Sequence, residues 1–238
     1  MRELDSIAIA GAGRLGTALT AALGAAGFVV LGPLGRGADA GCATAVLLCV
    51  PDGEIAAAAA TIAPGPLVGH CSGATGLEPL APHEAFSLHP LMTVPADAPA
   101  GVLAGAGCAI DGSTPRALAA AEALAAALGM RATRVAAEDR AAYHAAASIA
   151  SNFLVGLEGA AERLAATAGV DRELLVPLVR AAVENWAERG AAGALTGPIA
   201  RGDEATVASQ RAAVAERAPD LLPMFDAMVE ATRGMVLA

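Results

Sequence analysis

A glycine-rich segment near the N-terminus constrains the fold of this chain more than any other feature. Gly11, Gly13 and Gly16 follow an apolar run at residues 7–10 and precede an alanine-rich segment at residues 17–26. A strand, a tight glycine turn and a helix in this order are typical of a dinucleotide-binding site. The first glycine permits the turn, the second lets backbone approach a pyrophosphate, and the third lets the helix pack on the strand.

The residues of this loop are the expected contacts of the cofactor phosphates. Gly11, Gly13, Arg14, Leu15 and Gly16 lie at the start of the predicted helix. Free backbone N–H groups and the positive end of the helix dipole favour an anion there.

The segment after the second predicted strand bears on which dinucleotide binds. The strand covers residues 28–31, and Arg36 follows where an NAD site usually has Asp or Glu. An arginine suits a 2′-phosphate, so Arg36, helped by Arg14, favours NADP over NAD. The alternative is that Arg36 is a solvated loop residue.

The first 136 residues alternate strand-like and helix-like segments. Further strands are expected at residues 44–50, 66–69, 86–88, 107–111 and 130–135, and a helix at residues 114–128. Fully apolar strands such as residues 44–50 belong to parallel sheets that are covered on both faces. The sequence therefore predicts an α/β fold, a Rossmann-like doubly wound parallel sheet, over residues 1–136.

Residues at the ends of two strands are further candidates for cofactor contacts, because ligands of open α/β sheets bind at the carboxyl edge. Val50 and Pro51 end one strand, and Ser72 and Gly73 follow the next one. We expect Ser72 and Gly73 to approach the nicotinamide through their backbone. Asp52 is expected to cap the helix that follows it.

Residues 137–238 are predicted to form an all-helical second domain. A proline-free segment at residues 138–168 predicts one long helix, and Asp171, Asp203 and Pro219 mark the starts of three more. The long helix is rich in alanine and has few large side chains to bury within its own domain. We therefore expect it to pack against a second copy and form a homodimer through the helical domain.

Composition excludes several classes of partner. The formal net charge is -9, and all fifteen basic residues are arginine. An acidic chain without a basic run is a poor candidate for binding nucleic acid or an anionic membrane, and no apolar run reaches the length of a membrane span. The N-terminus runs directly into the first strand without room for a signal peptide, so we expect a cytoplasmic protein. The four cysteines show no C-x-x-C spacing and are expected to be buried free thiols, with no metal site.

Several motifs occur in an order that resembles a known family. They are the glycine loop and residues 50–52, 70–73, 89–91, 143–152 and 195–203. This series is similar to a bacterial family of Rossmann-like proteins with a helical C-terminal domain of the 6-phosphogluconate-dehydrogenase type. Ketopantoate reductase, pyrroline-5-carboxylate reductase and deazaflavin-dependent NADP reductases are related to it. The resemblance implies a nicotinamide-dependent oxidoreductase, commonly a dimer.

One stripe of polar side chains on the long helix is the main catalytic candidate. Hydroxyacid dehydrogenases of the wider superfamily use a lysine on this helix as proton donor, and this chain has no lysine. His144, Ser148 and Asn152 are spaced at i, i+4 and i+8, which places them on one helix face. We expect His144 to protonate the substrate and Ser148 and Asn152 to hold the carbonyl oxygen. The alternatives are a polar interdomain seam or an exposed face, and for His144 a structural role.

Three other side chains complete the candidate set. His89 precedes a proline at a predicted strand end and is either a second candidate acid or a turn residue. Arg201, in a glycine-flanked loop, is expected to hold a substrate carboxylate or to pair with Asp203 or Glu204. Tyr143 points away from the stripe and is expected in the core or at a dimer contact.

These features predict hydride transfer from NADPH to a carbonyl carbon of a small carboxylate. Reduction of a 2-ketoacid, as in ketopantoate reductase, is the leading hypothesis, and reduction of an imine of the pyrroline-5-carboxylate type is the second. A protein that senses NADP(H) without turning it over is the alternative of another class, because a fold alone does not fix a function.

Overall fold

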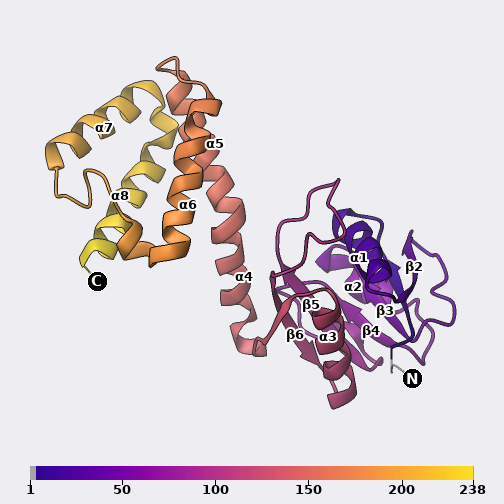
Figure 1. Ribbon diagram of the computed structural model, residues 1–238. Coiled ribbons are helices and arrows are strands. Elements are labelled where there is room, and N and C mark those ends of the chain that lie inside the picture. The colour runs from indigo at the N-terminus through magenta and orange to yellow at the C-terminus, as the bar shows by residue number, and fades with distance from the viewer. Residues whose placement is uncertain (1–3, 238) are drawn as a thin grey trace. The chain divides into compact units, whose positions relative to one another are not determined.

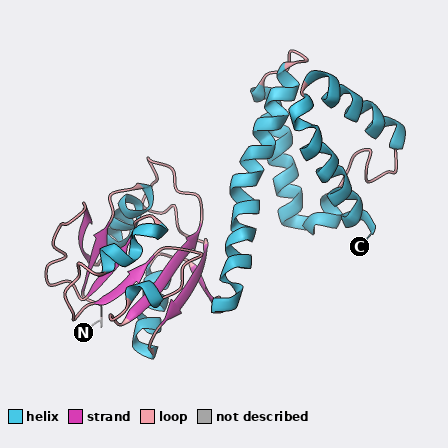
Figure 2. Ribbon diagram, turned by 180° about the vertical axis from the view of Figure 1, so that it is seen from behind, coloured by secondary structure: helices cyan, strands magenta, loops and turns pink. Residues whose placement is uncertain are grey.

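The computed structural model describes residues 4–237, and the chain divides into two compact units, Met1–Ile149 and Ala150–Ala238. The strands all belong to the first unit, while the second consists of helices and connecting loops (Figure 2). Within the described range, no helix combines the length and the apolar character needed to cross a membrane.

The first unit is a seven-stranded sheet with helices (Figure 1). Neighbouring strands follow the order β2-β1-β3-β4-β5-β6-β7. Strands β1 to β5 run parallel, β6 is antiparallel to β5, and β7 is parallel to β6. The predicted α/β sheet is confirmed, with one reversal that the sequence did not indicate. The elements are β1 (Ser6–Ala10), α1 (Arg14–Ala25), β2 (Val29–Leu34), β3 (Ala45–Leu48), α2 (Ile55–Ala59), β4 (Leu67–His70), β5 (Ala85–Leu91), β6 (Gly107–Gly112), α3 (Pro115–Ala127), β7 (Arg131–Arg134) and α4 (Arg140–Ser148).

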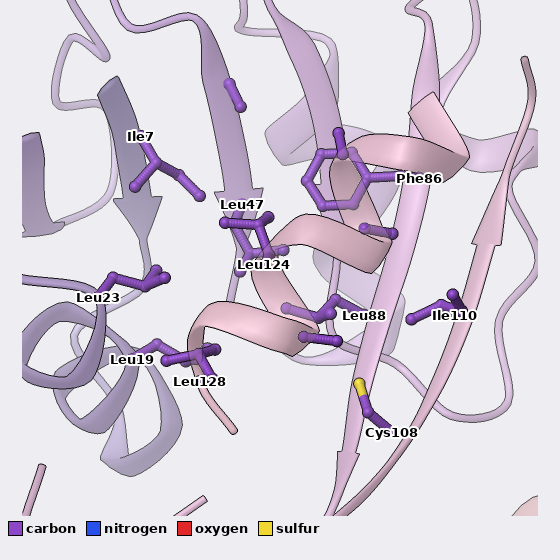
Figure 3. Close-up of a cluster of buried hydrophobic side chains, with 14 of the residues drawn as sticks. Ile7, Leu19, Leu23, Leu47, Phe86, Leu88, Cys108, Ile110, Leu124 and Leu128 are labelled. Atoms are coloured by element: carbon purple, nitrogen blue, oxygen red, sulfur yellow. The ribbon is translucent and has the colours of Figure 1, made fainter. Parts of the chain in front are cut away.

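The side chains of the strands alternate between two buried clusters, one on each face of the sheet. The larger cluster lies between the sheet and helices α1 and α3. Leu19 of α1 and Leu124 of α3 belong to it together with Ile7, Leu47 and Phe86 of the strands, and Leu124 lies beside Leu47 (Figure 3). The smaller cluster contains Ile55 of α2 on the other face. Burial on both faces explains why these strands read as apolar runs.

The α-helices in the described part of the second unit are α5 (Leu154–Ala166), α6 (Arg172–Ala194), α7 (Glu204–Arg217) and α8 (Leu222–Leu237). The predicted long helix corresponds to α4, a π-helical turn (Ile149–Phe153) and α5 in direct succession. Asp203 caps α7 as predicted, since its carboxylate accepts from the backbone N–H of Thr206. Asp171 occupies the N-cap position of α6, where a helix start was predicted, but its side chain forms no capping hydrogen bond. Gly190, with φ +71°, kinks α6.

The sheet unit extends beyond the expected domain boundary at residue 136. Its compact unit ends at Ile149 and includes α4. The reason is that Arg140 and Tyr143 of α4 bond to residues of the sheet, at Ser87, Asp111 and His89.

Candidate functional site

The glycine loop lies where β1 ends, and two of its glycines are required by the protein itself. A Cβ on Gly11 would stand 2.2 Å from the carbonyl oxygen of Cys49, and one on Gly16 would stand 1.9 Å from the carbonyl oxygen of Gly11. Gly11 also has φ +119°, a backbone conformation that other residues rarely adopt. A Cβ on Gly13 would meet nothing within 4 Å. The space beside Gly13 is therefore open to a ligand.

The start of α1 completes this anion cradle. Gly13 is the N-cap of the helix and offers no side-chain oxygen to the first N–H groups. Arg14 at the first helical position is exposed, and Leu15 beside it is partly buried against the core. Unpaired N–H groups at a helix start, an open space and a nearby cation suit a pyrophosphate.

Arg36 follows β2. This strand includes a cis peptide bond between Gly32 and Pro33 and ends at Leu34. The expected strand end at residue 31 was therefore too early. The Arg36 guanidinium lies 2.8 Å from the Glu54 carboxylate, with side-chain exposures of 85% and 45%. A 2′-phosphate bound at Arg36 would therefore also lie near the Glu54 carboxylate, which carries the same sign of charge.

The loop after β4 is held by its own hydrogen bonds. The hydroxyl of Ser72 donates to the Asp52 carboxylate at 2.6 Å and accepts from the backbone N–H of Thr75. Asp52 thus binds Ser72 and forms no helix cap, contrary to the prediction. The backbone N–H of Ser72 donates to Nδ1 of His70 at 3.2 Å and is already used within the protein. Val50 and Pro51 lie at the same carboxyl edge, just after β3.

His89 is the centre of a second group of polar residues. It lies inside β5, opposite Ala109 of β6, and is not the turn residue considered as an alternative. Its Nδ1 lies 2.8 Å from the hydroxyl oxygen of Tyr143, and the two rings meet edge to face. The His144 ring centroid is 6.2 Å from that of His89. A Cβ on Gly73 would stand 2.7 Å from the imidazole, so Gly73 packs against the ring.

The surroundings of His89 keep its imidazole neutral. Burial, then the positive charges of His144 and Arg140, lower its pKa to about 4, against the opposing effect of Asp52. Burial raises the pKa of Tyr143, so its hydroxyl keeps its proton at neutral pH, although a backbone hydrogen bond from Ala109 acts the other way. A neutral imidazole and a protonated phenol therefore face each other.

Arg140 is a buried cation that the sequence interpretation missed. Its guanidinium donates to the carbonyl oxygen of Thr75 at 3.2 Å, to the Ser87 hydroxyl at 3.0 Å and to the Asp111 carboxylate at 3.1 Å. Its Nε has no hydrogen-bond partner among the described residues. The sequence feature that could have identified this arginine is its i, i+3 spacing from Tyr143, which places both side chains on one helix face.

The predicted polar stripe is only partly preserved by the helix geometry. His144 is exposed and Ser148 is half-buried, and both belong to α4. Asn152 is exposed and lies in the π-helical turn, which has more residues per turn than an α-helix. The α-helical spacing on which the stripe was predicted therefore holds for His144 and Ser148 but not for Asn152. Tyr143, expected in the core or at a dimer contact, instead bonds to His89.

Arg201 lies in the second unit, in the turn before α7. Its side chain is exposed, and its charge helps to lower the pKa of Asp203 after the larger effect of hydrogen bonds from Thr206.

The four cysteines are free thiols in the structure. Cys42 is exposed, so the expectation of buried thiols was wrong there, while Cys108 is buried. Cys49 and Cys71, on neighbouring strand ends, have sulfur atoms 3.8 Å apart. Across residues 4–237, no group of three or more His, Cys, Asp or Glu side chains is placed to hold a metal ion.

Comparisons with known proteins place this geometry in context. A family model described as Domain of unknown function (DUF2520) matches residues 106–232. A search of curated proteins gives no significant match.

Solved structures similar to this chain share its architecture over almost the full length. A candidate NADP oxidoreductase from Bacteroides fragilis has a TM-score of 0.82 at 19% identity, over 98% of this chain and 99% of its own. A Thermotoga maritima protein has a TM-score of 0.77 at 24% identity, over 97% and 98%. An imine reductase from Streptomyces aurantiacus has a TM-score of 0.64 at 16% identity, over 98% of both chains. These likenesses confirm the predicted fold, a Rossmann-like domain followed by a helical one.

Proposed function

The chain belongs to the family described as Domain of unknown function (DUF2520), and we propose that this member is an NADP-dependent oxidoreductase. It transfers hydride to a carbonyl carbon of a small carboxylate, with 2-ketoacids as the favoured substrates. The B. fragilis neighbour, described as a candidate NADP oxidoreductase, agrees with this cofactor.

The observation that carries the proposal is the open space at Gly13, at the same sheet edge as His89. Gly11 and Gly16 are required by close backbone contacts, while Gly13 is not, so its lack of a side chain serves a ligand. The N–H groups of Arg14, Leu15 and Gly16 would hold the pyrophosphate, and Arg36 the 2′-phosphate. Val50, Pro51, Ser72 and Gly73 would line the nicotinamide side. When bound, the nicotinamide supplies the hydride.

Protonation of the reduced substrate is assigned to the histidines. His144 is exposed and free to reach a ligand, and it acts as the general acid. His89 is held neutral and polarises the substrate oxygen as a hydrogen-bond donor. Ser148, one turn further along α4, holds the carbonyl oxygen.

Imine reduction is the second candidate, because a structural neighbour over the full chain is an imine reductase. The same groups would serve it, since a developing amine and a developing alkoxide both need a proton donor.

The test is to mix the purified chain with NADPH and a panel of 2-ketoacids and cyclic imines and to follow the loss of NADPH absorbance. Turnover of a ketoacid supports the proposal, and turnover of imines alone moves the assignment to the second candidate. Micromolar NADPH binding without turnover of any compound would favour a sensor.

A homodimer through the helical unit is part of this proposal. That unit exposes large apolar side chains, including Leu174, Leu178 and Trp186, the last 58% exposed. Exposed apolar side chains of this size mark interaction surfaces. Light scattering that gives the mass of one chain at micromolar concentration would contradict the dimer.

A further inference from the structure

Tyr143 approaches His89 from a separate element in a fixed geometry. It is the one tyrosine of the chain, and its hydroxyl oxygen lies 2.8 Å from Nδ1 of His89. One turn earlier on α4, Arg140 bonds to Ser87 of β5 and Asp111 of β6. This buried anchor sets the position of Tyr143 along β5.

The hydrogen bond between Tyr143 and His89 bears on where the protons lie. The phenol has one proton to donate and keeps it at neutral pH, because burial raises the pKa of Tyr143. Among the described residues, Nδ1 of His89 is the acceptor available to the hydroxyl proton. A neutral imidazole carries one proton, so an Nδ1 that accepts leaves that proton on Nε2.

The second ring nitrogen of His89 is available to a ligand. The structure gives Nε2 no hydrogen-bond partner within residues 4–237, and the side chain is partly exposed. Gly73 packs against the ring, so the imidazole is held between the loop after β4 and Tyr143.

We propose that Tyr143 is a positioning residue and proton relay for His89, which holds the Nε2–H tautomer and refills Nδ1 when Nε2 gives its proton to the substrate. This inference rests on the proposed function. It adds a second route of protonation beside His144.

The step balances in atoms and charge. As the carbonyl carbon accepts a hydride, the C=O π electrons move to oxygen, and this oxygen forms a bond to the proton of Nε2. The Nε2–H bond breaks, Nδ1 takes the hydroxyl proton of Tyr143, and His89 stays neutral throughout. The phenolate then regains a proton from water. Because Nδ1 takes up a proton as Nε2 loses one, His89 does not become an imidazolate anion, a charged form that its buried surroundings disfavour.

The decisive experiment is nitrogen NMR of the full chain labelled at histidine, because N–H and bare ring nitrogens have separate shifts. The four histidines give a small set of signals, and His89→Asn identifies those of His89. We expect the proton on Nε2 in the wild type, and a mixture of tautomers in Tyr143→Phe. His83→Asn is the matched control, since His83 bonds to Ala59 away from this site and its loss should leave the His89 signals unchanged.

Two outcomes overturn the proposal. One is a wild-type His89 with its proton on Nδ1, a result that needs no variant and does not depend on whether Tyr143→Phe folds. The other is a tautomer that is unchanged in a folded Tyr143→Phe chain.

Kinetics separate this inference from the proposed function. With any substrate that the wild type reduces, Tyr143→Phe should lower kcat by about 10 to 100-fold and change KM by less than about twofold. This loss of kcat is smaller than the loss expected when a general acid itself is removed. An unchanged kcat contradicts the relay. If the wild type reduces nothing in the panel, the proposed function fails, while the NMR result still decides how Tyr143 and His89 are paired.

Discussion

The guanidinium of Arg140 donates to the Asp111 carboxylate at 3.1 Å, and the arginine side chain is only 5% exposed. The pair joins the first turn of α4 to β6 and fixes the helix on the sheet. Removing one member of such a pair leaves a buried charge without its partner, which costs more than the pair contributes.

Asp111→Ala should therefore lower the free energy of unfolding by about 3 kcal/mol. Denaturant unfolding followed by circular dichroism measures it. Glu54→Ala is the control, because it breaks an exposed pair with Arg36 and should cost under about 1 kcal/mol. Equal losses in the two variants would contradict the assigned role of Arg140.

The glycine loop predicts two separable effects. Gly16→Ala should lower the melting temperature, since its Cβ would stand 1.9 Å from the carbonyl oxygen of Gly11. Gly13→Ala should keep the wild-type melting temperature and lose the stabilisation by added NADPH, because its Cβ enters open space. Thermal melts with and without NADPH test both, and an unchanged NADPH effect in Gly13→Ala would remove the main support for the cofactor site.

Arg36 and Glu54 should act in opposite directions on cofactor choice. NADPH should bind more tightly than NADH by about 1 to 3 kcal/mol, the value of a charge-assisted hydrogen bond, and Arg36→Ala should abolish this preference. Glu54→Gln should strengthen NADPH binding, because it removes the carboxylate 2.8 Å from the guanidinium. Calorimetry with both dinucleotides checks this, and a preference that survives Arg36→Ala would be decisive against it.

The two histidines near Tyr143 should be distinguishable by turnover. His144→Ala should leave NADPH affinity nearly unchanged and lower kcat by about 100 to 10,000-fold, as loss of a positioned general acid does. His89→Ala is the comparison in the same assay. A loss in His89→Ala alone would move the acid to β5, and a loss in neither would leave protonation to Tyr143 or to water.

Stability should fall as the pH drops from 6.5 towards 5. Burial lowers the pKa of His89 to about 4 and also lowers that of His70. In the unfolded chain both begin to bind a proton near pH 6.5, whereas in the folded chain each binds its proton only at lower pH, so lowering the pH favours unfolding. The pKa of Glu84 is lowered chiefly by the hydrogen bond from Thr114. The stability that this gives is lost only as the pH falls below the unfolded value near 4.5, outside the range considered. His89→Asn should reduce the loss between pH 6.5 and 5, measured by denaturant unfolding, and an identical slope would contradict the burial effect.

Local patterns in the sequence were sufficient for much of the fold. The order of strand, glycine turn and helix located β1 and α1, and Thr114 caps α3 at the start of its predicted segment. These features depend on neighbours within a few residues. The reversal of β6 depends on which strand it pairs with, and no local pattern encodes that partner.

The candidate site was harder to predict because its contacts are distant in sequence. His89 and Tyr143 are 54 positions apart, and each is unremarkable alone. His89 was placed at a strand end because Pro90 follows it, but pairing with β6 continues the strand to Leu91. Asn152 was placed on the stripe with an α-helical period, and the π-helical turn was not visible in the sequence.

The reversed strand also affects how the protein can fold while it is synthesised. Because β6 and β7 run opposite to β5, the chain leaves the sheet at the edge far from the glycine loop, and α4 must run back along β5 and β6. Asp111 is separated from Arg140 by 29 positions and emerges from the ribosome before it. Until α4 has folded against the sheet, the cation beside this carboxylate is Arg134 of β7, whose guanidinium lies 4.0 Å from Asp111.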